Sequence, residues 1–72
     1  MEFHQRLKDM RTDKDMNQTE FGTMLNMTQR KISRLERKNT EPTPAEIKNI
    51  CEKLNISADY LLGLTDIPRK LK

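Results

Sequence analysis

Four side chains that can hydrogen-bond to nucleic-acid bases occur within a short stretch of this chain. At helical spacing they fall largely on one face, which comprises Gln29, Arg30, Ser33 and Arg34. Arginine can pair with both acceptors of guanine, glutamine with adenine, and serine with either base. A helix that exposes this set therefore has the chemistry needed to read base edges in the major groove of DNA.

Positive charge is concentrated on the same stretch. From Thr28 to Thr40 there are five Lys and Arg residues and one acidic residue, Glu36, which gives a local balance of +4. The whole chain carries +3, so the remaining residues sum to −1. Such a cluster attracts a phosphate backbone, although a charge run alone more often marks the solvated face of an ordinary helix. The elements that position the cluster decide between these two interpretations.

The residues before the charged stretch predict a shorter helix that starts at Asn17. Asparagine is a good N-cap, and Glu20 three positions later can reach back to the N–H of Asn17, as in a capping box. A shared apolar face follows at helical spacing, formed by Phe21, Met24 and Leu25. Gly22 beside this face has no side chain, so a neighbouring helix can approach closely.

A tight turn separates this helix from the charged one. Asn26 tolerates a left-handed backbone, so it can end the first helix without strain. Thr28 then caps a second helix over residues 29–37, which Ile32 and Leu35 anchor to the core. Two short helices joined by a tight turn, with the charge on the second, are typical of chains that present a helix to the DNA major groove. This context favours the DNA-binding interpretation of the charge.

Three further helices are expected, so the fold class is all-α, a compact five-helix bundle. The first covers residues 2–14. Another begins at Pro44, because Thr43 is a good N-cap and Glu46 supplies the acid of a capping box. Its predicted buried face comprises Ile47, Ile50, Cys51 and Leu54.

The end of the chain is predicted to form a last short helix. Ser57 caps this helix, which runs through Leu62. Gly63 is the expected stop, which leaves Leu64 to pack back against the core. The residues that follow are basic and form a tail.

Length and composition agree with one small domain. A chain of 72 residues buries only about 60% of the surface that it exposes when unfolded, which predicts a thin stability margin. Its residues are 33% hydrophobic and 35% charged. We expect a helix-turn-helix domain over residues 1–64 and a basic tail over residues 65–72. No signal peptide or membrane span is expected, which favours a cytoplasmic protein without a membrane partner. No metal or other cofactor is expected, because His4 is the single histidine and Cys51 the single cysteine.

Several motifs together carry a family resemblance. They are F-x-x-R-L-K-x-M-R at 3–11, N-Q-T-E-F-G at 17–22, I-S-R-L-E-R at 32–37, Pro42, and S-A-D-Y-L-L-G-L at 57–64. In these motifs the chain resembles the Cro and phage-repressor type of helix-turn-helix domain, the XRE-like family of small bacterial and phage regulators. The resemblance implies a fold of the phage-repressor type and a sequence-specific double-stranded DNA-binding transcriptional regulator. Family habit favours a repressor over an activator.

The resemblance also implies roles for individual residues. The base-facing residues are Gln29, Arg30 and Arg34, and Ser33 shares their face. The expected phosphate-binding set comprises Asn17, Gln18, Thr28, Lys31, Arg37, Lys38 and Asn39. Arg11 is expected to pair with Glu36 in a structural ion pair. Lys38 stands where the family commonly has Gly, so a positive φ at Lys38 would cost about 1 kcal/mol.

The expected partner is a near-palindromic double-stranded operator bound by a homodimer. Dimerisation is expected to be weak in solution and completed on DNA, through the segment 60–67. In that segment Tyr60, Leu62 and Ile67 fit ordinary packing within the domain as well as they fit a dimer contact. No small-molecule effector is expected, so control would come through a protein antagonist, proteolysis or competition for the site.

Two other function classes remain open from the sequence. A protein-interaction module could reuse the same fold, since fold alone does not fix function. It would carry apolar anchors on the exposed face of residues 29–37, where this chain has Gln, Arg and Ser. An enzyme is the least favoured class, because the chain has no nucleophile–base pair, Gly-rich phosphate loop or metal cluster.

Overall fold

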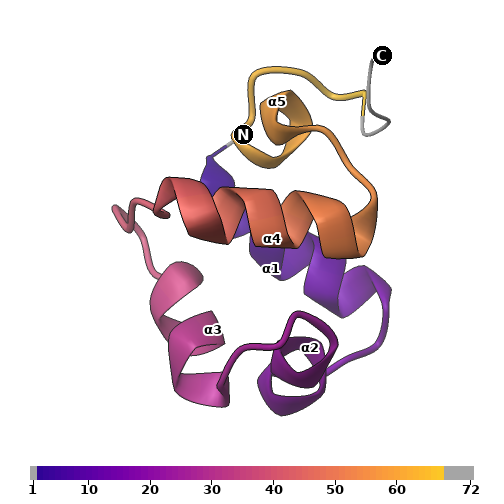
Figure 1. The fold of residues 1–72 in the computed structure, drawn as a ribbon, viewed down its shortest axis with the longest axis vertical. Coiled ribbons are helices and arrows are strands. Elements are labelled where there is room, and N and C mark those ends of the chain that lie inside the picture. The colour runs from indigo at the N-terminus through magenta and orange to yellow at the C-terminus, as the bar shows by residue number, and fades with distance from the viewer. Residues whose placement is uncertain (1, 68–72) are drawn as a thin grey trace.

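Residues 2–67 are described by a computed structural model, in which they form five α-helices and no strand (Figure 1). The helices are α1 (Phe3–Asp13), α2 (Gln18–Met24), α3 (Gln29–Leu35), α4 (Pro44–Leu54) and α5 (Ala58–Leu61). The predicted all-α fold of five helices is therefore confirmed. Most of the predicted tail, residues 68–72, lies outside the described residues.

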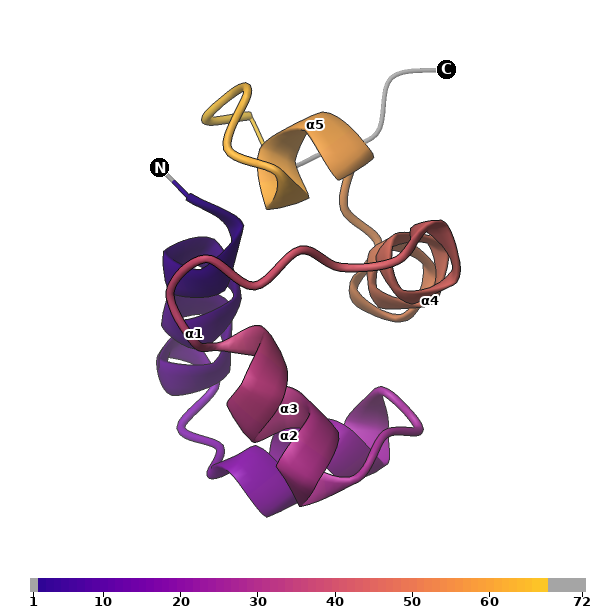
Figure 2. The same ribbon diagram turned by 90° about the vertical axis from the view of Figure 1, so that its left-hand side faces the viewer.

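The helices surround one apolar core. α1 and α4 lie on opposite sides of it, α5 covers one end, and α2 and α3 close the other end (Figures 1 and 2). The largest fully buried side chains are Leu7, Phe21, Leu25, Ile32, Leu35, Ile50 and Leu61. Full burial of one such side chain stabilises the fold by about 1.5–3 kcal/mol. Four of these side chains come from α2, its C-cap residue Leu25 and α3. The helix pair is therefore held firmly on the core.

Helix starts follow the predicted caps. The confirmed N-caps are Asn17, Thr28, Thr43 and Ser57. The Asn17 side chain accepts the N–H of Glu20, and the Glu20 carboxylate accepts the N–H of Asn17, at 2.8 and 2.9 Å. Thr43 and Glu46 exchange the same two bonds at 3.1 and 2.8 Å. Both predicted capping boxes are present, because each needs only two residues three positions apart.

Left-handed backbone occurs where small polar residues or glycine allow it. Asn26 has φ 58°, as its place in the turn after α2 requires. After α3 the positive φ, 68°, falls on Asn39 rather than on Lys38. Asparagine tolerates this conformation better than lysine does, so Lys38 carries no backbone strain.

Two helix ends differ from the predictions. α3 ends at Leu35, with Glu36 as its C-cap, so Arg37 lies in the following turn rather than in the helix. α5 ends at Leu61, and Leu62 is its C-cap. Helix ends lack partners for their last carbonyls and tighten readily into turns, which makes them harder to predict than the capped starts.

The prediction that Leu64 packs back against the core is wrong. Gly63 ends α5 in the left-handed conformation, and the N–H of Leu64 bonds to the carbonyl of Asp59 at 2.8 Å. The Leu64 side chain is nevertheless 75% exposed. On α5 itself, the ring of Tyr60 contacts Arg6, whose guanidinium lies 4.0 Å over it.

Arg6 connects α1 to the segment after α5. Its residue is only 7% exposed, and its Nη2 donates to the carbonyl of Thr65 at 3.3 Å and to Asp66 at 3.2 Å. The stacked Tyr60 ring provides a further favourable contact for the cation. The first residues of the predicted tail are therefore held against α1 by a buried arginine.

Candidate nucleic-acid interface

α3 presents a charged face to solvent and an apolar face to the core. Ile32 and Leu35 are fully buried. The polar side chains of α3 lie on the opposite side of the helix and therefore point outward. A hollow of about 400 Å³ opens in this outer surface. It is lined by Thr28, Arg30, Lys31, Arg34 and Arg37. Four cations thus surround one concave surface, an arrangement suited to a polyanion.

Gly22 fixes how closely the turn packs on α2. A Cβ atom at this position would lie 2.6 Å from the carbonyl oxygen of Met27, which is backbone and cannot rotate away. The N–H of Met27 donates to the carbonyl of Gly22 at 2.7 Å. Asn49 on α4 donates its side-chain amide to the carbonyl of Leu25 at 2.7 Å. These contacts set the position of α3 relative to the rest of the domain.

Arg11 and Glu36 meet in a buried, two-point ion pair. Arg11 Nε lies 2.7 Å from Glu36 Oε2, and Arg11 Nη2 lies 3.2 Å from Glu36 Oε1. The two side chains are 14% and 5% exposed. The hydrogen bond that Arg11 donates to Glu36 raises the pKa of Arg11, although burial opposes the charge. Arg11 also donates to the carbonyl of Met16 at 2.9 Å, so one guanidinium joins α1 to the start of α2 and the end of α3.

Gln18 and Gln29, predicted to bind phosphate and bases respectively, contact each other. Gln29 Nε2 donates to Gln18 Oε1 at 2.6 Å, and Gln18 Nε2 donates to Glu36 Oε1 at 3.2 Å. The first side chain of α3 is therefore connected through Gln18 to the buried ion pair. This chain of hydrogen bonds orients both amides before any ligand is present.

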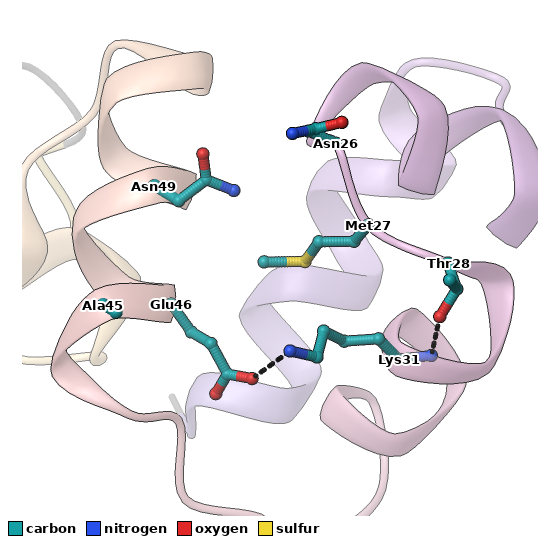
Figure 3. A pocket seen from close by; sticks show the side chains of 7 residues that line it. All are labelled: Asn26, Met27, Thr28, Lys31, Ala45, Glu46 and Asn49. Atoms are coloured by element: carbon teal, nitrogen blue, oxygen red, sulfur yellow. Dashed lines mark hydrogen bonds and ion pairs between the residues drawn. The ribbon is translucent and has the colours of Figure 1, made fainter.

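Arg34 and Lys31 both contact Glu46, at the start of α4. Arg34 Nη2 lies 2.7 Å and Lys31 Nζ 3.2 Å from Glu46 Oε2. Figure 3 shows the Lys31 side chain extending from α3 across to Glu46 beneath Met27. Burial would raise the pKa of the Glu46 carboxyl, but the Thr43 N–H and the two cations hold that pKa below its usual range. From the sequence Glu46 is predicted only as part of a helix cap, and no local pattern indicates its contact with α3.

The other predicted site residues lie around the α3 surface. Arg30 is exposed at the solvent side of α3, and Ser33 is half-buried. Asn17 is exposed at the N-terminus of α2. Lys38 and Asn39 are exposed in the turn after α3, outside the basic hollow. The structure thus brings Arg30, Lys31, Arg34 and Arg37 together, whereas Lys38 lies outside this group in the turn that follows α3.

Other kinds of site find little support in the part of the chain that the structure describes. Residues 2–67 contain no group of three or more His, Cys, Asp and Glu side chains placed to hold a metal ion. No helix in this range is both long enough and apolar enough to span a bilayer. The single histidine, His4, contacts an acidic neighbour, with its Nδ1 3.1 Å from Glu2 Oε2.

Comparison with protein-family models gives a match. A family model described as Helix-turn-helix matches residues 7–61, well over half of the chain. The match begins within α1, contains α2 and α3 entirely, and ends at the last residue of α5. No curated protein shows a significant match to the chain.

Proposed function

The chain belongs to the Cro/C1-type, XRE-like family of helix-turn-helix DNA-binding domains and is a DNA-binding transcription regulator, and we propose that it is a sequence-specific repressor. α3 is the recognition helix and enters the major groove of double-stranded DNA. The observation that carries this proposal is the basic hollow of α3, formed by Arg30, Lys31, Arg34 and Arg37 over a fully buried apolar face.

The side chains divide into base-reading and phosphate-binding groups. We assign base reading to Gln29, Arg30, Ser33 and Arg34, whose donors and acceptors match base edges. We assign phosphate binding to Asn17, Gln18, Thr28, Lys31, Arg37, Lys38 and Asn39. Gln18 already accepts a hydrogen bond from Gln29 and donates one to Glu36. Its phosphate contact must therefore use the second hydrogen of its side-chain amide.

The distribution of apolar side chains supports DNA rather than protein as the partner of α3. Among the described residues, the exposed large apolar side chains are Leu62, Leu64 and Ile67. None of them lies on α3, and a partner-binding helix would need apolar anchors on its exposed face. The alternative of a protein-interaction module through α3 is therefore disfavoured.

The proposed active form is a homodimer on a near-palindromic operator. A recognition helix of seven residues contacts too few base pairs to select a site alone. The exposed Leu62, Leu64 and Ile67 support a dimer contact in the segment 60–67. Tyr60, in contrast, is half-buried and packs on the core and Arg6. Half-sites would lie about 34–36 Å apart, and a one-to-one protein–DNA stoichiometry at saturation would contradict the dimer.

Selection of bound sequences from a random duplex pool tests this function. We expect enrichment of a near-palindromic sequence, and binding that weakens steeply with salt. Each neutralised phosphate contributes about −0.9 to the slope of log K against log[salt]. A reporter gene with the selected site in its promoter should be expressed less when the protein is present. Absence of any enriched sequence would refute specific recognition, and a rise in expression would refute repression.

A further inference from the structure

Glu46 contacts two cations of α3 from a buried position on α4. The residue is 7% exposed. Its two carboxylate oxygens have separate partners. Oε1 accepts a hydrogen bond from the N–H of Thr43 at 2.8 Å. Oε2 accepts a hydrogen bond from Arg34 Nη2 at 2.7 Å and forms an ion pair with Lys31 Nζ at 3.2 Å. One oxygen therefore caps α4, and the other holds the ends of two side chains that line the basic hollow.

The cap does not explain the contact with the cations. A capping box is satisfied by glutamine as well as by glutamate, because a neutral oxygen accepts the N–H of the cap residue. A neutral amide could not make charge-assisted bonds to Arg34 and Lys31. The charge of Glu46 therefore favours both the start of its own helix and the two cations of α3.

Arg34 and Arg30 differ in how freely they can move. Arg30 makes no hydrogen bond or ion pair with residues 2–67, so its side chain becomes ordered only when DNA binds. The guanidinium of Arg34 is already held by Glu46, while its side chain remains 45% exposed and lines the hollow. Glu46 contacts Nη2 alone, so most of the five N–H donors remain for a base. A side chain held in place before binding loses less freedom on binding.

We propose that Glu46 is a positioning residue for base recognition, which holds Arg34 in the orientation that reads a base pair and keeps Lys31 beside it. The proposal rests on the function proposed above and adds a residue of α4 that touches no DNA. In this arrangement the buried carboxylate determines sequence preference through Arg34.

The test compares Glu46→Gln with wild type on the selected operator and on duplexes that each carry one changed base pair. A good bidentate arginine contact discriminates between bases by about 5–150-fold. In Glu46→Gln, discrimination at the base pair read by Arg34 should fall towards the value measured for Arg34→Ala. Discrimination at the other positions of the operator should remain at the wild-type value. Glu52→Gln, an exposed change on the same helix, is the matched control and should behave as wild type.

Additional variants separate positioning from stability. In an Arg34→Ala background, Glu46→Gln should cause no further loss at that base pair. Arg34→Lys keeps the charge and leaves α4 untouched, and it should lose the same discrimination even if Glu46→Gln fails to fold. Thermal melts report folding independently. Wild-type discrimination in Glu46→Gln or in Arg34→Lys would overturn the proposal, as would an equal affinity change on every duplex. Failure of wild type to enrich any sequence would instead refute the proposed function.

Discussion

Two glutamates hold the two sides of α3, and their surroundings differ. Glu36 pairs with Arg11 on the core side, where the two side chains are 5% and 14% exposed. Glu46 is similarly buried at 8%, but its partners Arg34 and Lys31 are 45% and 44% exposed. The first pair is enclosed by protein on both sides. In the second group Glu46 is protected from solvent, whereas Arg34 and Lys31 reach it.

This difference suggests different uses of the same chemistry. A cation whose partner and surroundings are fixed can only hold elements together, as Arg11 does for α1 and the ends of α2 and α3. A half-exposed cation keeps donors for a ligand while one side is restrained. The Arg11–Glu36 pair should therefore govern folding, and the Glu46 contacts should govern recognition.

Arg11→Ala should have the largest effect and should act on stability. Its loss leaves the Glu36 carboxylate buried without its cation, which costs about 3–5 kcal/mol when burial is full. Domains of this size are stable by only about 5–15 kcal/mol, so this loss would remove a large share of the stability. Chemical denaturation of Arg11→Ala measures the change, with the exposed Lys8→Ala on the same helix as the control. A wild-type unfolding midpoint for Arg11→Ala would break the contrast between the two pairs.

Arg30→Ala should have the next largest effect and should act on binding alone. Arg30 is exposed near the start of α3, so its removal leaves the core intact. Loss of a base contact should weaken binding to the preferred site by about 1–3 kcal/mol and relax the choice of base at one position. Titrations on matched and mismatched duplexes, together with a melt, measure both effects. Equal weakening on every duplex would mean that Arg30 contacts phosphate.

Lys31→Ala should produce a smaller, uniform effect. A phosphate contact carries no sequence information, so affinity should fall alike on all duplexes. The magnitude of the salt slope should decrease by about 0.9, the contribution of one phosphate. Salt titrations of wild type and Lys31→Ala on two unrelated duplexes provide the measurement. A change in base preference would show that Lys31 participates in reading.

Acid should reveal the smallest effect, a pH-dependent contribution of Glu46 to stability. Its pKa in the folded protein lies below the ordinary value of 4.5, so its contacts stabilise the fold above that pH. This contribution is lost as pH falls below about 4.5 and through the folded pKa, and screening of the half-exposed cations keeps it modest. Unfolding curves should show wild type losing more stability than Glu46→Gln over this range. Parallel curves would indicate that the charge of Glu46 contributes little to folding.

Local patterns predicted the frame of the candidate site well. The starts of α2, α3 and α4 follow from Asn17, Thr28 and Thr43, because a cap and its partner lie three residues apart. Helical spacing likewise identified Ile32 and Leu35 as core residues and left the cations on the opposite face. The exact ends of α3 and α5 were less accessible, since termination depends on the turn that follows each helix.

By itself the sequence determined that this protein is an all-helical domain in which a basic helix follows a tight turn, because caps, helical period and local charge are short-range properties. Only the tertiary structure decided which cations are restrained. Arg34 meets Glu46 across 12 positions in the chain, and Arg6 meets Asp66 across 60, so no local period relates either pair. Such contacts depend on how the helices pack, and packing is set by the whole core at once.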